Sequence, residues 1–446
     1  MTFLFAGLVN VAAQDKITLT WQADTENEKE LQIRVTSGED FTVDWGDGTI
    51  ETETGRGTEL GNVVHLSRTY ATAGEYTMTI EGVTANCRFV TFYCGALFLE
   101  DNQQVTSLDV SKCKALRTLG CQNNLLENLD VSGLTNLQTL DCEGNQLTKL
   151  NLSGCSALQA LWVNKNQLQS LNLTNCTSLE TLYCSNNQLT ELDLSSYTNL
   201  QYLVCYNNQL TELDLNGCAN LQTLYCYDNQ LQNLNLTGCT NLSYLSCYNN
   251  QLQLSDLYAA NLQVTSFNRY FGTQNLPSRT ATVGEQLFAD QSVFTQIITN
   301  NKIFTQYTVT RKNGSIHPLD YTVIDGKLTF NIAGDYTVTM VNAAIVTDMK
   351  YPAEVIVDMK VTAGTGITES VLSNIKIYPN PTSDSFIIDY EGLIQVKIYD
   401  MLGKEILTRD VNGKTEINIS NFPKGIYNVN IFSESKIIGN SKIVKQ

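Results

Sequence analysis

The chain has 446 residues and a formal net charge of −17, with 45 acidic against 28 basic side chains. This excess of carboxylates repels phosphate backbones and anionic lipids, so it argues against binding nucleic acids or membrane surfaces, although it also serves solubility alone. The two histidines, His65 and His317, lie far apart in the sequence, so a catalytic triad, a zinc site or a histidine general base is hard to assemble.

Residues 1–14 are predicted to be a secretory signal peptide. The short apolar core Phe3–Val9 is followed by Val11, Ala12 and Ala13, the small residues that a signal peptidase requires. No Lys or Arg precedes Lys16, so we expect the signal to be truncated at its start. The core is too short to span a bilayer, and no later stretch reaches the roughly 18 apolar residues of a membrane helix.

Residues 15–85 are predicted to form a β-sandwich. Ile17–Trp21 and Leu31–Val35 alternate apolar and polar residues, and turn residues follow Phe41–Trp45. The W-G-D-G piece at 45–48 and the Y-x-x-x-G-x-Y piece at 70–76 resemble a PKD-type domain, a common extracellular spacer. The resemblance implies a domain that shields the first unit of the repeat that follows. Asp44 and Asp47 suggest a calcium site, acid catalysis or, as we favour, two carboxylates that hold a tight turn.

A repeat dominates residues 86–276. The copies begin at Leu119, Leu140, Leu161, Leu182, Leu203, Leu224 and Leu245, in steps of 21 residues. An earlier copy, Leu97–Asn102, lies 22 residues upstream of Leu119. The unit L-x-x-L-x-C-x-x-N-x-L-x-x-L-[DN]-[LV]-[ST] resembles the leucine-rich repeat of internalin-like bacterial proteins. The predicted fold class is therefore mostly β, a solenoid with a parallel sheet flanked by small β-sandwich domains.

Alternation along each strand predicts an inner and an outer face. In Thr139–Glu143, Leu140 and Cys142 should point into the solenoid, and Thr139, Asp141 and Glu143 to its concave surface. The Asn column from Asn102 to Asn250 is predicted to turn inward, where its amides satisfy backbone groups at each bend.

Eleven of the thirteen cysteines also follow the repeat. One column holds Cys121, Cys142, Cys184, Cys205, Cys226 and Cys247, with Val163 at the matching place; a second holds Cys113, Cys155, Cys176, Cys218 and Cys239, alongside Leu134 and Tyr197. Positions that accept Val, Leu and Tyr are apolar, so we expect buried free thiols rather than disulfides, and no metal site. Cys87 and Cys94 fall outside both columns and are the pair expected to be oxidised.

Aromatic residues crowd the outward-facing strand positions of the later repeats. These positions carry Trp162, Tyr183, Tyr202, Val204, Tyr206, Tyr225, Tyr227, Tyr244 and Tyr248, and none carries Lys or Arg. The first repeats show Gly120, Gln122, Asp141 and Glu143 instead. Such a patch favours binding of a protein or glycan partner. Two alternatives stay open: the rings stabilise the sheet by stacking across strands, or another domain covers them.

The repeat decays after Asn250. Leu254–Ala260 predicts one or two helical turns, and Phe267–Gln274 a degenerate closing strand. Residues 277–362 are predicted to form a second β-sandwich, because runs such as Lys327–Ile332 and Asp335–Met340 alternate. Residues 363–371 are predicted to be a linker.

Residues 372–446 closely resemble the C-terminal sorting domain of the type IX secretion system. The resemblance rests on Tyr378, Pro379, Asn380 and Pro381, then Gly403, then Gly425 and Tyr427, and finally Lys442 and Lys445 close to the end. It implies that these residues carry the secretion signal, that the secretion machinery is a partner, and that the protein is secreted or attached to the outer surface of a Gram-negative bacterium. Alternation at Tyr427, Val429 and Ile431 independently predicts an antiparallel sandwich.

The function predicted from these features is binding or adhesion through the concave aromatic face. The alternative is a structural spacer of the cell surface or extracellular matrix, with no dedicated ligand. We do not expect an enzyme or a cofactor, because the sequence offers no nucleophile–base pair, metal cluster or phosphate loop.

Overall fold

The computed structural model describes residues 14–25, 28–57, 62–95, 104–264, 268–295, 300–317, 319–345, 347, 353–363, 375–400, 404–433 and 436–446. The chain divides into two compact units, one of residues up to 281 with 285–360, the other of 282–284 with the residues from 361. Four sequence predictions lie wholly or largely outside the described residues: the signal peptide, the Leu97–Asn102 copy, the linker and Gly403.

The first unit begins with a β-sandwich, as predicted. Its strands are β1 (Lys16–Ala23), β2 (Lys29–Val35), β3 (Asp40–Asp44), β4 (Ile50–Thr54), β5 (Val64–Arg68), β6 (Gly74–Gly82), β7 (Phe89–Tyr93) and β8 (Val105–Asp109). One sheet has the order β4-β3-β6-β1-β8, and β5-β2-β7 start the other. Trp21, Trp45 and Tyr70 fill the core, where the Tyr70 hydroxyl accepts from Trp21 Nε1 at 3.0 Å and donates to the Trp45 carbonyl at 2.9 Å. Kinship with PKD-type domains stays a prediction.

Asp44 and Asp47 hold a turn, as we favoured. Asp44 Oδ1 accepts from the Gly46 amide and Asp47 Oδ1 from the Thr49 amide, at 3.0 and 2.9 Å. Arg68 pairs with the Asp47 carboxylate, and this contact together with the local hydrogen bonds lowers the pKa of Asp47.

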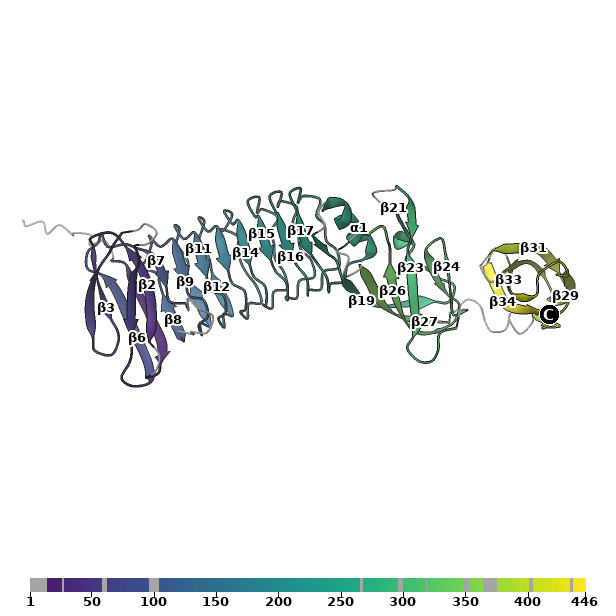
Figure 1. The fold of residues 1–446 in the computed structure, drawn as a ribbon, viewed down its shortest axis with the longest axis horizontal. Coiled ribbons are helices and arrows are strands. Elements are labelled where there is room, and N and C mark those ends of the chain that lie inside the picture. Colours follow the sequence, from purple (N-terminus) through teal and green to yellow (C-terminus); the bar gives the residue numbers. More distant parts are fainter. Residues whose placement is uncertain are drawn as a thin grey trace, which may run out of the picture. The chain divides into compact units, whose positions relative to one another are not determined.

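The repeats form a parallel sheet, visible in Figure 1 as a row of short arrows. Its strands are β9 (Thr118–Gly120), β11 (Thr139–Asp141), β13 (Ala160–Trp162), β14 (Thr181–Tyr183), β15 (Tyr202–Val204), β16 (Thr223–Tyr225), β17 (Tyr244–Ser246) and β18 (Arg269–Tyr270). On the other side of the solenoid, β10 (Asn128–Asp130) pairs in parallel with β12 (Lys149–Asn151). Each repeated Leu, such as Leu140, lies opposite its copy in the next strand, here Leu161. The 21-residue register and the parallel sheet are confirmed.

The solenoid sheet continues directly into the N-terminal sandwich. The complete order is β18-β17-β16-β15-β14-β13-β11-β9-β7-β2-β5, so no edge separates the two parts. Strand β7 runs parallel to β9 and antiparallel to β2, with Phe92 opposite Leu119. The strand beside β9 is therefore Phe89–Tyr93, and the predicted copy Leu97–Asn102 lies outside the described residues. The later part of that expected copy, β8, instead pairs with β1 of the sandwich.

A ladder of asparagine side chains runs through the interior, as predicted. Asn208 is typical: its Nδ2 donates to the carbonyls of Cys184 and Cys205, both at 3.1 Å, and its Oδ1 accepts from the Leu189 amide at 3.0 Å. Equivalent bonds recur at Asn124, Asn145, Asn166, Asn187, Asn229 and Asn250. Gln274 takes over after the last repeat, donating to the Cys247 carbonyl and accepting from the Leu252 amide. The ladder thus fixes each bend against its neighbour.

The cysteines are buried free thiols, and none of the thirteen forms a disulfide. Burial raises their pKa values, that of Cys184 to about 12. In the second column three thiols, those of Cys155, Cys218 and Cys239, donate to a carbonyl of the preceding repeat, and the Tyr197 hydroxyl does the same to Leu173. This shared donor role explains why Cys and Tyr share a column.

Two predictions were wrong, that Cys94 falls outside both columns and that Cys87 and Cys94 are oxidised, whereas Cys87 does lie outside both columns. The register of β7 with β9 places Cys94 beside Cys121, so Cys94 begins the first column. Cys87 lies in the sandwich against Gly82, and both are free thiols. The error about Cys94 arose because β7 lies outside the seven regular copies of the repeat.

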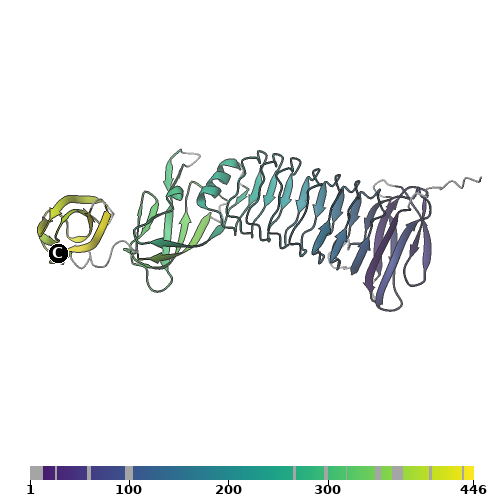
Figure 2. The same cartoon turned by 180° about the vertical axis from the view of Figure 1, so that it is seen from behind.

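The C-terminal end of the solenoid is covered within the same unit. Helix α1 (Leu254–Gln263) buries Leu254, Leu257 and Ala260, and the Leu254 amide donates to Gln291 Oε1 at 2.9 Å. A second β region follows, with strands β19 (Thr273–Thr282), β20 (Gln286–Leu287), β21 (Val293–Thr295), β22 (Lys302–Phe304), β23 (Gln306–Arg311), β24 (Tyr321–Ile324), β25 (Lys327–Phe330), β26 (Gly334–Val341) and β27 (Glu354–Thr362), and the short 3-10 helix η1 (Ala289–Gln291). Its sheets have the orders β19-β27-β26-β23 and β20-β25-β24, with a β21-β22 hairpin (Figure 2).

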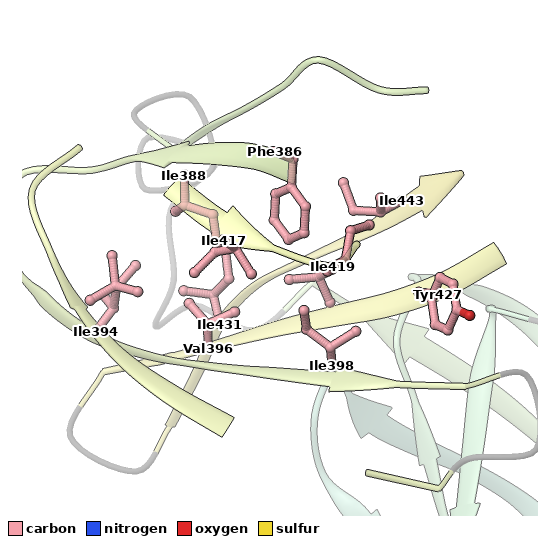
Figure 3. Close-up of a cluster of buried hydrophobic side chains, with 12 residues drawn as sticks. Phe386, Ile388, Ile394, Val396, Ile398, Ile417, Ile419, Tyr427, Ile431 and Ile443 are labelled. Carbon is pink, nitrogen blue, oxygen red and sulfur yellow. The ribbon is translucent and has the colours of Figure 1, made fainter. Parts of the chain in front are cut away.

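The second unit is an antiparallel sandwich, as the alternation predicted. Its strands are β28 (Lys376–Tyr378), β29 (Ser385–Asp389), β30 (Leu393–Tyr399), β31 (Glu405–Asn412), β32 (Thr415–Asn418), β33 (Gly425–Ser433) and β34 (Lys436–Lys445). They form sheets of order β28-β29-β32 and β31-β30-β33-β34. Phe386 and Ile417 of one sheet meet Val396 and Ile431 of the other in the core (Figure 3).

Candidate functional site

The outer face of the parallel sheet carries three rows of side chains. The first row precedes each buried Leu, the second follows it, and the third follows the buried Cys or Val. The first row is Thr118, Thr139, Ala160, Thr181, Tyr202, Thr223 and Tyr244; the second is Tyr93, Gly120, Asp141, Trp162, Tyr183, Val204, Tyr225, Ser246 and Tyr270; the third is Gln122, Glu143, Asn164, Ser185, Tyr206, Tyr227 and Tyr248. Aromatic rings therefore come together because the register repeats.

The third row contains a stack of three tyrosines. The ring centroids of Tyr206 and Tyr227 are 4.4 Å apart with 7° between their planes, and those of Tyr227 and Tyr248 are 4.4 Å apart with 13°. Adjacent strands of a sheet lie about 4.8 Å apart, so in-register tyrosines stack with little adjustment. The stack covers the ring faces of Tyr227 and turns the ring edges and hydroxyls outward.

The first and second rows add a tilted series of rings beside this stack. Tyr225 and Tyr244 are 4.8 Å apart, and Tyr244 and Tyr270 are 5.4 Å apart. Trp162 meets Tyr183 edge to face at 6.2 Å. Tyr202 is 39% exposed, the highest exposure among the predicted site residues of this face. Every one of the eight predicted aromatic site residues thus lies on the outer face, half-buried or exposed.

Three tyrosine hydroxyls of this face, those of Tyr227, Tyr244 and Tyr248, have raised pKa values and remain protonated near neutral pH. Burial raises the pKa of Tyr227, Tyr244 and Tyr248, and neighbouring tyrosines raise that of Tyr227 and Tyr244 further. No residue of the three rows from Thr181 to Tyr248 is Lys or Arg. The tyrosine end therefore offers apolar ring area with neutral hydroxyl donors and acceptors.

The opposite end of the outer face is polar. Asp141 and Glu143 lie two residues apart on one strand, and Glu143 pairs with Lys165 at 2.8 Å. Burial, followed by the charge of Glu143, raises the pKa of Asp141 to about 6, although the Glu143 amide donates to Asp141 Oδ1 at 3.1 Å. Perturbed carboxyl groups of this kind are common at functional sites.

Sequence reasoning missed two residues of the second row, Tyr93 and Tyr270. Tyr93 lies opposite Gly120, and Tyr270 lies opposite Ser246. Both belong to strands outside the seven regular copies, so the 21-residue period does not locate them. The Thr-x-Tyr-Cys pattern at 91–94, which matches Thr-Leu-Tyr-Cys at 181–184, was a signal that could have found Tyr93.

The predicted secretion-signal residues lie at several places in the second unit. Asn380 Oδ1 accepts from the Val444 amide at 2.9 Å, and its Nδ2 donates to the Lys442 carbonyl. Lys445 is 8% exposed, and its Nζ donates to the carbonyls of Ile419, Ser420 and Phe422. The chain around Asn380 is thereby joined to the last strand.

The remaining signal residues are less enclosed, except for Tyr427. Tyr378 is 37% exposed, and Pro379 and Pro381 each follow a cis peptide bond. Gly425 begins β33, and Tyr427 is buried in the core with its hydroxyl donating to the Pro423 carbonyl.

In the part of the chain that the structure describes, no group of three or more His, Cys, Asp or Glu side chains is arranged to hold a metal ion. Over those same residues, no helix combines the length and apolarity needed to cross a bilayer.

Two family models match the chain. Residues 376–446 match the secretion system C-terminal sorting domain, and residues 177–217 and 219–259 match leucine-rich repeats. The chain carries leucine-rich repeats and a C-terminal sorting domain. The sorting domain marks the leucine-rich-repeat protein as type IX secreted, extracellular or attached to the cell surface.

The repeat region also resembles solved leucine-rich-repeat structures. The functional domain of InlJ from Listeria monocytogenes, which includes a cysteine ladder, is 21% identical over 58% of this chain and 74% of its own, with a TM-score of 0.23. The leucine-rich effector YopM from Yersinia pestis is 31% identical over 31% of this chain and 39% of its own, with a TM-score of 0.29. The TLR13–ssRNA13 complex is 20% identical over 39% of this chain and 26% of its own, with a TM-score of 0.30.

One curated relative shares a short segment. An endo-acting ulvan lyase of Formosa agariphila is 34% identical over 77 residues. The match spans 16% of this chain and 15% of the lyase, so most of each protein lies outside it.

Proposed function

We propose that the protein binds a protein or glycan partner outside the cell through the outer face of its repeat sheet, without catalysis. The observation that carries the proposal is the set of eight half-buried or exposed aromatic residues on one face. Half-exposed Tyr and Trp combine apolar area with a hydrogen-bonding group at low entropic cost, which suits binding surfaces. The leucine-rich repeats and the sorting domain support a binding protein that acts after export.

The second candidate is a structural spacer, and the tyrosine stack favours it. Centroid separations of 4.4 Å cover the faces of Tyr227, and aromatic pairs stabilise a sheet by themselves. In that role the face binds no partner, and removal of the rings changes stability alone.

Glycan and peptide arrays probed with the secreted chain separate these candidates. The test variant is Y206A/Y227A/Y248A, and the matched control is Q167A/Q188A/Q209A, which removes three exposed side chains from three consecutive repeats. We expect array binding by the wild type and the control, and its loss in the tyrosine variant. Binding that is unchanged in the tyrosine variant contradicts the aromatic-face proposal.

For the second unit we propose that Tyr378, Pro379, Asn380, Pro381, Gly403, Gly425, Tyr427, Lys442 and Lys445 form the signal read by the secretion machinery. The bonds that join Asn380 and Lys445 to distant parts of this unit support a signal that depends on the folded sandwich. Asn380→Ala should leave the chain in the periplasm, and Asn418→Ala, at a nearby turn, should not. Normal export of Asn380→Ala contradicts the proposal.

A further inference from the structure

The polar end of the outer face holds a carboxylate between two aromatic residues. In the second row Asp141 lies between Gly120 on one strand and Trp162 on the next. The ring of Tyr93 occupies the space that a side chain at position 120 would need, since a Cβ on Gly120 would come within 2.2 Å of Tyr93 Cδ1. Asp141 is therefore flanked by the Tyr93 ring on one side and the Trp162 indole on the other.

The polar atoms around Asp141 are short of hydrogen-bond donors. One Asp141 oxygen accepts a single hydrogen bond from the Glu143 amide. Asn164 lies in the third row beside Glu143 and is 8% exposed, yet its Oδ1 is buried and accepts no hydrogen bond. A buried amide oxygen without a partner is costly, so it indicates a donor that this chain does not supply.

The local charge is also uncompensated. Lys165 pairs with Glu143, and Asp141 has no ion pair, so these three side chains together carry one negative charge. Burial makes that charge unfavourable, which is why the pKa of Asp141 is raised to about 6. A cation placed beside Asp141 removes the penalty.

We propose that this cluster, Asp141, Asn164, Trp162 and Tyr93, binds the guanidinium group of an arginine side chain presented by a protein partner. A guanidinium has five N–H donors and no acceptor, which matches the carboxylate of Asp141 and the unpartnered Oδ1 of Asn164. It is planar and weakly hydrated, and it stacks on aromatic rings. An ammonium is more strongly hydrated, and a sugar hydroxyl brings no charge to compensate Asp141.

This inference deepens the proposed function and rests on it, because it assigns a protein partner to the outer face. The two can still fail separately, since the tyrosine stack begins at Tyr206, two repeats beyond Trp162. The arginine cluster is tested with a small probe, and the partner-binding face with the arrays described above.

Trp162 reports on its own site. The chain has three tryptophans, and Trp21 and Trp45 are fully buried in the sandwich core, so a ligand on the outer face should change the emission of Trp162 alone. The full chain is titrated at pH 7.5 with N-acetyl-arginine amide, N-acetyl-citrulline amide and N-acetyl-lysine amide. Citrulline retains the shape of arginine but carries a neutral urea.

We expect a saturable change with the arginine probe, at least tenfold weaker binding of citrulline, and weaker binding of lysine than of arginine. Asp141→Asn should weaken arginine binding at least tenfold, and Glu212→Gln, which removes an exposed carboxylate elsewhere in the solenoid, should not change it. Asn164→Leu should weaken arginine binding several-fold and leave the change in emission in place at high probe concentration.

Equal binding of arginine and citrulline, or unchanged arginine binding by Asp141→Asn, overturns the guanidinium site. A response to neutral oligosaccharides that needs Asp141, without a response to arginine, overturns it in favour of a sugar subsite. If the arrays detect a tyrosine-dependent partner and the arginine probe fails, the proposed function stands and only this inference falls.

Discussion

The two faces of the parallel sheet follow different rules although they come from the same strands. Inside, the columns are nearly invariant, because Leu, Cys (with one Val) and Asn return at each step of the repeat. Outside, each position of a row can change, from Gly120 to Asp141 to Trp162 along three neighbouring strands. Interior positions are fixed by packing and hydrogen bonding, and the outer rows are free to carry function.

This comparison predicts the largest loss of stability for the interior ladder. Asn208→Ala leaves the Leu189 amide without its partner. It also removes one of the two side-chain hydrogen bonds that each of the Cys184 and Cys205 carbonyls accepts, so the free energy of unfolding should fall by about 3 kcal/mol for the three lost bonds. Urea unfolding followed by circular dichroism measures it. The control is Asn220→Ala, at an exposed residue that donates to the Thr198 carbonyl and accepts a long hydrogen bond from Asn241, and it should cost under about 1 kcal/mol. Equal losses in both variants would remove the distinction between the faces.

The next largest effect is a gain in stability, expected from a substitution of Asp141 on the outer face. The folded pKa of Asp141 is about 6, above the ordinary aspartate value of 3.8, so its contribution to stability is present below pH 3.8 and is lost as the pH rises through 6. Asp141→Asn should therefore raise the free energy of unfolding above pH 7, on the order of 2 kcal/mol, with little gain near pH 4.

Thermal unfolding of both proteins from pH 4 to pH 8 checks this, with Glu212→Gln as a flat control. The charge of Glu143 also raises the pKa of Asp141, so the comparison is repeated in Glu143→Gln, where the gain should shrink as that source of the raised pKa disappears. A constant difference at every pH would contradict the assignment to Asp141.

A smaller effect separates two tyrosines of the same face. Tyr227 stacks on Tyr206 and Tyr248, whereas Tyr202 makes none of these ring contacts. Tyr227→Ala should lower the free energy of unfolding by about 1 kcal/mol more than Tyr202→Ala, the sum of two aromatic pairs. Equal losses would mean that the stack contributes no stability of its own.

The smallest effect is expected in the cysteine column. Val163 already occupies one place, so Cys205→Val should change the free energy of unfolding by less than about 1 kcal/mol, whereas Cys205→Ser buries a hydroxyl and should cost about 1–3 kcal/mol. The native thiols should resist iodoacetamide at pH 8, since burial raises their pKa values and blocks access. Rapid labelling of the native chain would contradict buried thiols.

The sequence predicted the interior better than the ends. The period locates every Leu, Cys and Asn from Leu119 to Asn250, because seven repeats impose the same packing constraint. It fails at β7, where Phe92 replaces Leu and the spacing to Leu119 is 27 residues rather than 21, so the strand pairing is set by the sandwich beneath it. It also fails at Gln274, which lies after helix α1 and makes the hydrogen bonds that the repeated Asn makes elsewhere in the ladder.

The candidate site was predicted only where it lies within the regular repeats. Alternation places Trp162, Tyr183 and the later tyrosines outward, and the structure agrees. The cluster around Asp141 depends on Tyr93 of β7, whose ring lies over Gly120. The repeat pattern does not predict this contact, because it does not predict that β7 lies beside β9.

Because Gln274 ends the asparagine ladder, the number of repeats in the solenoid can change between related proteins. Both ends of the solenoid are terminated by bonds from strands that do not belong to the regular copies, β7 and β18. Between them, one whole 21-residue module can be deleted or duplicated while each terminus still finds an identical neighbour. Insertions of other sizes place polar side chains where Leu and Asn are required. The outer face therefore grows or shrinks by whole repeats. The genes of different strains should accordingly differ in this region by whole 21-residue modules.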